Sequence, residues 1–304
     1  MLCSTAVKAQ ESKKKICFIV NPISGTGKHK NIETLIQHVL DQKQFDYKIL
    51  YTEKPKHAIE LSRSAALEGT HIIVAVGGDG SVNEVTQGII GSHATLAIIP
   101  TGSGNGCARC LGIPQNLTKA IKIINHMYSQ WVDTVQINQY FYLGVAGIGF
   151  DADMSLAFSH LKKRGVFSYL LLILHKFFYY KPQDYRLIID GKQYNEKAFL
   201  ICFANTRQYG NNAFIAPHAK VDDGYLDVIV WKEFPPYAAF KLVHDLFTQH
   251  LYDSQYTKTF LCKEVILKKS PHILHIDGES ITFDTDIHIR ILPSSLKILI
   301  PQTD

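Results

Sequence analysis

The part of this sequence that most restricts its fold is a continuous apolar run, Ile72–Val76, that ends in glycines. An uninterrupted run of Ile, Val and Ala is typical of a strand buried on both faces, as in parallel sheets. Further strands are expected at residues 16–20, 47–51 and 95–99, with helical patterns at about residues 29–43 and 56–68 and a helix beginning near Ser81. This alternation predicts βαβ units and a parallel sheet with helices on both faces.

The pattern changes after about residue 131, where short alternating segments predominate. We predict strands there at residues 132–138, 140–146, 185–189, 197–204, 226–231, 264–267, 273–276 and 287–291. Turn signals such as Asp190-Gly191 separate or bound them, which is typical of a mostly antiparallel β-sandwich. The 304 residues are enough for two separate cores. We therefore predict an α/β domain over residues 1–131 and an all-β sandwich domain over residues 132–304.

The composition argues against several classes of protein. The net charge of +5 is modest, and the one dense basic cluster lies in an apolar segment treated below, so we expect no nucleic-acid partner. No run reaches the roughly 18 apolar residues of a membrane span, and Leu2–Val7 is too short for a secretory signal. The six cysteines are scattered except for Cys107 and Cys110, which we expect to be free thiols in a reducing cytoplasm.

The run at residues 72–76 leads directly into Gly77-Gly78-Asp79-Gly80, and a helix follows. Glycines let backbone N–H groups approach an anion without interference from a Cβ atom, and the helix N-terminus adds partial positive charge, so phosphate is the natural ligand. We expect Ser81 to cap the helix and Glu84 to complete a capping box. The alternative, a tight turn before an ordinary helix, gives the Asp79 carboxylate no purpose, because an acid repels phosphate unless a metal ion or a proton transfer uses it.

Two further polar loops, residues 21–25 and 100–105, also follow predicted parallel strands. The carboxyl ends of such strands form the edge at which these sheets bind ligands, so three glycine-containing loops there predict a site. The first loop is not a P-loop, because Pro22 stands where the first glycine belongs and no Ser or Thr follows Lys28. The Gly77–Gly80 loop also lacks the Gly-x-Gly-x-x-Gly spacing of dinucleotide sites.

Five motifs carry a resemblance to a known family. They are Asn21-Pro22-x-Ser24-Gly25, Gly77-Gly78-Asp79-Gly80-Ser81-x-Asn83-Glu84, Pro100-x-Gly102-Ser103-x-Asn105, Asp222-Asp223-Gly224-Tyr225 and Asp277-Gly278-Glu279. Together they resemble the catalytic domain of diacylglycerol kinases, which sphingosine and ceramide kinases share, and the bacterial soluble lipid kinases are nearest in length. The resemblance covers nearly the whole chain in the right order.

The resemblance implies a Rossmann-like domain and a β-sandwich domain with ATP between them, and a final segment that packs back on the first domain. The residues that would hold the nucleotide are Asn21, Pro22, Ser24, Gly25, Thr52, Gly77, Gly78, Asp79, Gly80, Ser81, Asn83, Glu84, Gly102 and Ser103. The resemblance places Mg²⁺ at Lys220, Asp223 and Tyr225, with Asp222 as a further candidate. Lys220 departs from the family, in which a small hydroxyl residue is common, so only its carbonyl would serve.

The same resemblance assigns the proton-accepting base to Asp277-Gly278-Glu279, and Asp79 completes the catalytic candidates. Phosphoryl transfer mainly requires aligned oxygens and neutralised charge, so acids there would hold Mg²⁺ or accept the hydroxyl proton. Asp277 and Glu279 would face the same side of an extended stretch. Glu279 is favoured as the base because its side chain reaches further, and Asp277 remains the alternative. Asp223-Gly224 and Asp277-Gly278 are also common hairpin turns.

Two features bear on the acceptor. Ser103-Gly104-Asn105-Gly106 is closer to the Gly-Ser-Gly-Asn of sphingoid and ceramide kinases than to the Asn-Asp that bacterial diacylglycerol kinases commonly carry after the third loop. The segment Leu156–Lys181 is apolar with Lys and Arg at its flanks, and no Asp or Glu occurs from Met154 to Gln183. Such a helix suits an anionic membrane surface. The alternative is a buried core helix with solvated lysines.

We conclude from the sequence that the chain is an ATP- and Mg²⁺-dependent lipid kinase that converts diacylglycerol to phosphatidic acid. The alternatives are a sphingoid-base or ceramide kinase, an NAD kinase-like enzyme and a non-catalytic, nucleotide-gated lipid sensor. We expect a cytoplasmic enzyme that associates peripherally with the inner membrane face and meets its lipid substrate there. The oligomeric state stays open, with a homodimer as one option.

Overall fold

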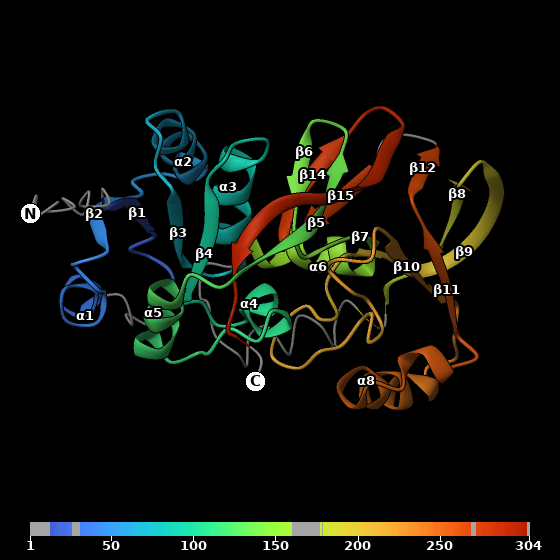
Figure 1. Ribbon diagram of the computed structural model, residues 1–304. Helices are drawn as coiled ribbons and strands as arrows, with labels where there is room; N and C mark the ends of the chain where they lie inside the picture. Colours follow the sequence, from blue (N-terminus) through green and yellow to red (C-terminus); the bar gives the residue numbers. More distant parts are fainter. Residues whose placement is uncertain (1–12, 26–30, 160–176, 178, 269–271, 303–304) are drawn as a thin grey trace, which may run out of the picture.

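A computed structural model describes residues 13–25, 31–159, 177, 179–268 and 272–302. The first half consists of β1 (Lys14–Val20), α1 (Ile32–Val39), β2 (Phe45–Tyr51), α2 (His57–Leu67), β3 (Ile72–Gly77), α3 (Asp79–Ile89), β4 (Thr95–Pro100), α4 (Gly106–Cys110) and α5 (Leu117–His126). Its strands pair in parallel in the order β4-β3-β1-β2. Helices α2 and α3 cover one face of this sheet, and α1 and α5 cover the other (Figure 1).

The second half is mostly antiparallel. Its elements are β5 (Ser129–Ile137), β6 (Tyr140–Tyr142), β7 (Val145–Gly149), α6 (Phe150–Ser159), β8 (Gln183–Ile189), β9 (Lys192–Ala204), β10 (Leu226–Lys232), α8 (Ala238–Thr248), a 3-10 helix (Leu251–Asp253), β11 (Thr257–Cys262), β12 (Glu264–Lys268), β13 (His272–Ile276), β14 (Glu279–Phe283) and β15 (Ile287–Leu299). The fold class predicted from the sequence, a parallel α/β part followed by an antiparallel sandwich, is confirmed.

Strand β15 connects the two halves. Its first part pairs antiparallel with β12 and β5, and near its end Ile298 pairs in parallel with Leu96 of β4. Leu296, Ile298 and Leu299 belong to the core of the first half. The two sheets therefore form one continuous hydrogen-bonded surface, which fixes the edge of the parallel strands relative to the antiparallel part.

Three buried clusters hold these layers together. The first contains the parallel strands and includes Phe18 and Leu96. The second lies inside the antiparallel half and includes Phe203 and Ile289, while the third covers the opposite face of β9 and β10 beneath α8 and includes Leu242. Burying a side chain of this kind contributes about 1.5–3 kcal/mol, so all three clusters are substantial.

Most predicted strands and helices occur with small shifts in their bounds, but two strands are much longer than predicted, since β9 begins at Lys192 and β15 continues to Leu299. One prediction needs a correction. The strand predicted at residues 140–146 is two strands, β6 and β7, which are interrupted at Leu143 and Gly144. A Cβ atom on Gly144 would lie 2.3 Å from Asp277 Oδ1, so the chain breaks where an acid from β13–β14 approaches it. Helices α4, α5, α6 and α8 and strands β11 and β14 were not predicted.

Most of the apolar segment predicted at Leu156–Lys181 lies outside the described residues, so the structure does not decide between the membrane and the core. Where the chain is described, none of its helices combines the length and the apolar character needed to cross a membrane.

Candidate active site

The loops after β1, β3 and β4 lie together at the carboxyl edge of the parallel sheet. Asn21 Nδ2 donates to Ser81 Oγ at 3.1 Å, and the hydroxyls of Ser24 and Thr101 are 2.7 Å apart. Thr52 lies at the same edge, where its N–H donates to the carbonyl of Val20. The structure thus brings the predicted residues of the first loop, the second loop and Thr52 to one place.

These loops approach one another backbone to backbone, which only glycine permits. Gly25 has a φ of +64°, and a Cβ atom there would lie 1.9 Å from the Thr101 carbonyl oxygen. A Cβ atom on Gly102 would lie 2.5 Å from the Cα atom of Gly78. Side chains are therefore excluded, and the edge presents peptide groups to a ligand.

The predicted capping box at the start of α3 is wrong. The helix begins at Asp79 with Gly78 as N-cap, and no side chain caps it. Ser81 Oγ instead accepts from Asn21, while the two carboxylate oxygens of Glu84 accept from Lys56 N and Ala58 N at the start of α2. Because side chains leave the first turn of α3 uncapped, its N–H groups and partial positive charge are available to an anion.

Asp79 faces the third loop. Its Oδ1 accepts from Cys107 N at 3.1 Å, at the start of α4. Burial raises the pKa of Asp79, while N–H groups of Cys107, Gly106 and Asn105 oppose that rise by bonding the charged form. The acid is thus held against the third loop. The described cysteines, Cys107 and Cys110 among them, are free.

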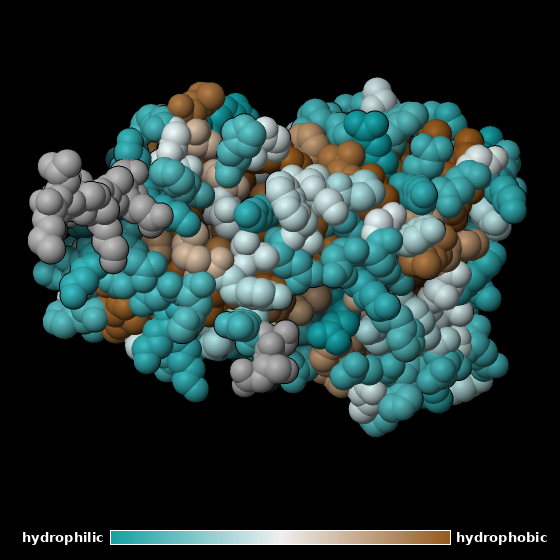
Figure 2. Space-filling model, viewed as in Figure 1, coloured by the Kyte–Doolittle hydropathy of each residue, from teal (hydrophilic) through white to brown (hydrophobic). Residues whose placement is uncertain are grey.

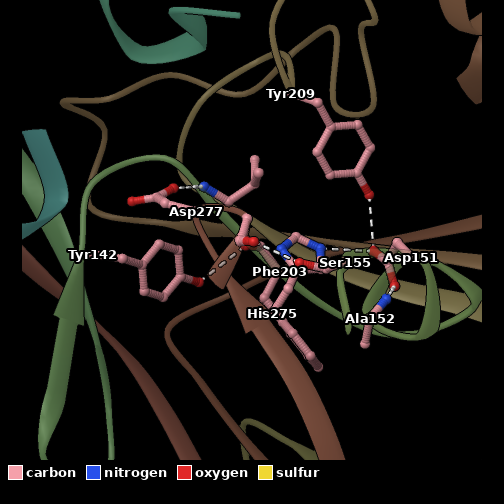
Figure 3. A network of polar contacts seen from close by, with 10 residues as sticks. Tyr142, Asp151, Ala152, Ser155, Phe203, Tyr209, His275 and Asp277 are labelled. Carbon is pink, nitrogen blue, oxygen red and sulfur yellow. Dashed lines mark hydrogen bonds and ion pairs between the residues drawn. The ribbon is translucent and has the colours of Figure 1, made fainter. Parts of the chain in front are cut away.

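Asp277 lies in the turn between β13 and β14 and reaches across to the first half. Its Oδ2 accepts from Asn83 Nδ2 of α3 at 2.9 Å, and its Oδ1 accepts from Val145 N at 2.8 Å. Figure 3 shows the bond to Oδ1. Burial raises the pKa of Asp277 to about 6, although the Asn83 and Val145 bonds favour the charged form. Since both of its oxygens already accept hydrogen bonds, the Asp277 carboxylate is fixed in position.

Glu279, two residues further on, has a different environment. It is exposed, and its Oε1 lies 3.4 Å from where a Cβ atom of Gly80 would be, over the first turn of α3. Among the described residues it has no hydrogen-bond partner. Although the residue as a whole is exposed, surrounding atoms crowd its carboxylate, and this desolvation together with repulsion from Glu84 raises the pKa of Glu279, while Lys56 lowers it. An unbonded carboxylate with a raised pKa beside a helix N-terminus is suited to accept a proton.

A notch separates the two halves at this point, at the top of Figure 2. It holds a small cavity of about 50 Å³, lined by Lys56, Ile59, Asn83, Glu84, Gln87, Tyr140, Ile276, Glu279 and Ile281. A larger hollow of about 260 Å³ lies over β5, β12 and β15, and none of the predicted site residues lines it. The notch, with polar groups of both halves around Glu279, is the better candidate.

The predicted metal loop, Lys220–Tyr225, lies before β10. Asp223 Oδ1 accepts from Tyr225 N at 3.0 Å, and Asp222 Oδ2 accepts from Gln130 Nε2 at 2.6 Å. The described residues contain no cluster of three His, Cys, Asp or Glu that would hold a metal ion. The remaining carboxylate oxygen of Asp223 and the backbone carbonyls are the hard donors that Mg²⁺ accepts, so their chemistry fits the ion. The metal role of this loop stays a prediction.

We call Asp277-Gly278-Glu279 the acid turn. Behind it lies a polar cluster that the sequence did not point to, formed by Asp151, His275 and Tyr209 (Figure 3). One signal was available. Asp151 comes two residues after Gly149, where the apolar segment Gly147-Ile148-Gly149 ends, while Asp79 comes directly after Gly77-Gly78.

The parallel sheet offers glycine-containing loops and a helix N-terminus to phosphate, and acids from the antiparallel half face them. This arrangement is typical of a phosphotransferase. A family model for the diacylglycerol kinase catalytic domain matches residues 15–137. A second, for a YegS C-terminal NAD kinase beta sandwich-like domain, matches residues 144–300. The chain belongs to this family of lipid kinases.

Individual relatives agree. A diacylglycerol kinase of Staphylococcus aureus (strain bovine RF122 / ET3-1) is 30% identical over 224 residues, which cover 72% of this chain and 70% of that protein. A diacylglycerol kinase of Bacillus subtilis (strain 168) is 28% identical over 278 residues, 88% of this chain and 90% of that protein. The crystal structure of a candidate diacylglycerol kinase from Bacillus anthracis str. Sterne superposes with a TM-score of 0.76 at 26% identity and covers 95% of this chain and 97% of that one. These findings confirm the resemblance and the prediction of a lipid kinase.

Proposed function

We propose that this enzyme transfers the γ-phosphoryl group of ATP to the free hydroxyl of diacylglycerol and forms phosphatidic acid. The substrate class follows from the family, and the relatives above named as diacylglycerol kinases support this acceptor. The observation that carries the chemistry is the exposed, unbonded carboxylate of Glu279 over the first turn of α3.

The glycine-containing loops at the carboxyl edge of the parallel sheet would hold the triphosphate. Their peptide N–H groups and the positive end of α3 offset the charge of the phosphates, and the loops after β1 and β4 close around them. Mg²⁺, when bound, would neutralise charge that develops on the transferring group. Asp79, held by Cys107 N, presents its second oxygen toward the third loop, where a Cβ atom on Gly104 would lie 3.4 Å away.

The acid turn would supply the base. Glu279 accepts the hydroxyl proton of the lipid while the hydroxyl oxygen attacks the γ-phosphorus, and ADP leaves with the bridging oxygen. Asp277 keeps the turn at the correct distance from α3 through Asn83. The division of roles between the two acids follows from their bonding: one has both oxygens engaged, and the other has neither.

Turnover of ATP with separate acceptors tests the proposal. The purified enzyme is assayed with mixed micelles of diacylglycerol, sphingosine or ceramide, and with NAD in solution. We expect ADP release to be fastest with diacylglycerol. Faster turnover with sphingosine or ceramide would move the acceptor to the sphingoid class suggested by Ser103–Gly106. Nucleotide binding without turnover on any lipid would favour the sensor.

We also propose that the enzyme meets its lipid at a membrane surface, and helix α8 supports this. Its inner face, with Leu242, packs on the third core cluster. Its outer face carries an apolar stripe that starts at the N-cap residue Tyr237 and continues with Phe240, Val243 and Phe247; these four are exposed by 76%, 86%, 51% and 51%. An exposed apolar stripe on a helix whose other face is packed on the core is suited to insertion among lipid head groups.

Co-sedimentation with vesicles of phosphatidylglycerol and phosphatidylcholine tests this surface. Phe240→Glu should reduce the bound fraction several-fold, because a charge would enter the apolar part of the interface. Leu67→Glu is the matched control, since Leu67 is 84% exposed on α2 in the other half. Equal binding by both variants would remove α8 from the interface.

A further inference from the structure

A cluster of polar side chains lies behind the acid turn, and the mechanism above does not use it. Asp151 Oδ2 accepts from Tyr209 OH at 3.0 Å and lies 3.0 Å from His275 Nε2 (Figure 3). Asp151 Oδ1 accepts from Ala152 N at 2.8 Å. The side chains of His275 and Asp151 are only 5% and 13% exposed, so these bonds are little weakened by water.

The surrounding backbone is shaped for this cluster. Gly147 of β7 faces it, and a Cβ atom there would lie 2.1 Å from Asp151 Oδ2 and 2.8 Å from His275 Nε2. His275 Nδ1 is buried and has no partner among the described residues. Among the described residues the ring therefore forms its hydrogen bond through Nε2, and Asp151 is the acid that His275 and Tyr209 share.

On one side the cluster leads to the third glycine loop. Gly210, next to Tyr209, forms a β-bridge with Asn105. A Cβ atom on Gly106 would lie 2.9 Å from the Tyr209 carbonyl oxygen, so the two segments are in close backbone contact. Cys107 N, the next group along, holds the Asp79 carboxylate. The Tyr209 bond therefore fixes the segment on which Asp79 rests.

On the other side the cluster leads to the acid turn. His275 is on β13, two residues before Asp277. Helix α6, which carries Asp151, makes a second contact with the turn, because Ser155 Oγ donates to the Gly278 carbonyl at 2.5 Å. Asp151 in α6 thus holds β13, the strand that leads to the acid turn, and Ser155 one helical turn later holds the acid turn itself.

We propose that Asp151 is a positioning residue for phosphoryl transfer that ties the segment holding Asp79 and the turn carrying Glu279 to one anchor. The two acids come from different halves of the chain, and Asp151 joins their supports through Tyr209 and His275. Asp151 does not touch the reacting atoms, so it acts through the geometry of the two loops. The inference rests on the proposed roles of Asp79 and Glu279.

Tyr209→Phe tests the anchor, since it deletes one hydroxyl and keeps the ring. The matched control is Tyr252→Phe, because Tyr252 OH donates to Asp227 Oδ1 at 2.8 Å in the same core cluster, and no described hydrogen bond links that pair to the acid turn. Both variants should lower Tm by similar amounts. Only Tyr209→Phe should lower kcat, by about tenfold to 10²-fold, since small misplacements of catalytic groups cost that much. KM for ATP should change little.

Amide hydrogen exchange gives a readout that does not depend on activity. In Tyr209→Phe the segment Asn105–Cys107 should exchange faster, and in Asp151→Asn both this segment and the turn at residues 277–279 should do so, while Tyr252→Phe leaves both unchanged. Equal loss of kcat in the two Tyr variants, or unchanged exchange at both segments in Asp151→Asn, would overturn the proposal. Failure of the proposed base shows instead as full activity of Glu279→Gln with the exchange pattern intact.

Discussion

Two Asp-Gly turns in the second half, Asp223-Gly224 and Asp277-Gly278, have the same sequence but different bonds. Both glycines have positive φ, +74° and +88°. Asp223 bonds within its own turn, to Tyr225 N two residues away. Asp277 bonds to Val145 N, 132 positions away, and to Asn83, 194 positions away.

The difference concerns what holds each carboxylate. An aspartate that bonds two residues along its own chain forms an ordinary side-chain turn. The Asp223 carboxylate has no described bond to another element, although the backbone of its turn is held from outside, where Gly224 N donates to Asp133 Oδ2. An aspartate whose two oxygens bind two other elements is placed by the tertiary structure, and it places the adjacent residues in turn. Glu279 is therefore presented to α3 from a rigid turn, which a local Asp-Gly hairpin would not provide.

The largest effect expected from this comparison is at Glu279. Glu279→Gln should lower kcat by about 10²–10⁴, the typical contribution of a general base, and leave ATP binding nearly unchanged. Tm should also stay close to that of the wild type, because the carboxylate has no hydrogen-bond partner among the described residues. Steady-state kinetics, nucleotide titration and thermal melts measure the three quantities. Turnover retained in Glu279→Gln but abolished in Asp277→Asn would reverse the roles, and activity in both would make the turn purely structural.

Asp277→Asn should show its effect in the pH dependence of stability. The pKa of Asp277 is about 6 in the folded chain, above the value of about 3.9 for an unfolded aspartate, so folding favours its protonated form. The stability this group contributes is full below about pH 4 and is lost as the pH rises through about 6. Asn has no such titration, so the Tm of the wild type minus that of Asp277→Asn should decrease from about pH 4.5 to about pH 7.5. A difference that is constant with pH would contradict the partly buried, bridging environment of Asp277.

The sequence predicted the local features of the fold well. Strands β3 and β4 were found because they are buried on both faces and are therefore apolar, whereas β2 at the edge of the sheet is partly exposed and contains Lys48. The glycine loops were found because each directly follows such a strand. Strand β14 was not found, since it is partly exposed and short, and the division between β6 and β7 depends on an acid from another part of the chain.

The site was predicted less completely, because most of its bonds join distant positions. Glu84 stands at the right spacing from Ser81 for a capping box. Its two carboxylate oxygens instead accept hydrogen bonds from backbone N–H groups at the start of α2. Asp151 and His275 are 124 positions apart, and no periodicity relates them. Residue type and spacing identified which acids were candidates, but only the fold shows which of them are bonded and which is free.

The smallest effect is expected at Asp223, and it sharpens the comparison. Asn at this position keeps an oxygen that accepts from Tyr225 N, so Asp223→Asn should change the free energy of unfolding by less than about 0.5 kcal/mol. If the Lys220–Tyr225 loop holds Mg²⁺, losing one carboxylate charge should raise the Mg²⁺ concentration needed for half-maximal activity by about tenfold, with kcat at saturating Mg²⁺ unchanged. Asp222→Asn is the matched control, since the Asp222 carboxylate accepts from Gln130, outside the turn. If Asp222→Asn instead raises the Mg²⁺ concentration needed for half-maximal activity, the Mg²⁺ ligand is Asp222. A loss of stability in Asp223→Asn well above about 0.5 kcal/mol would show that this carboxylate too is held by other parts of the fold, and the contrast between a local and a bridging aspartate would fail.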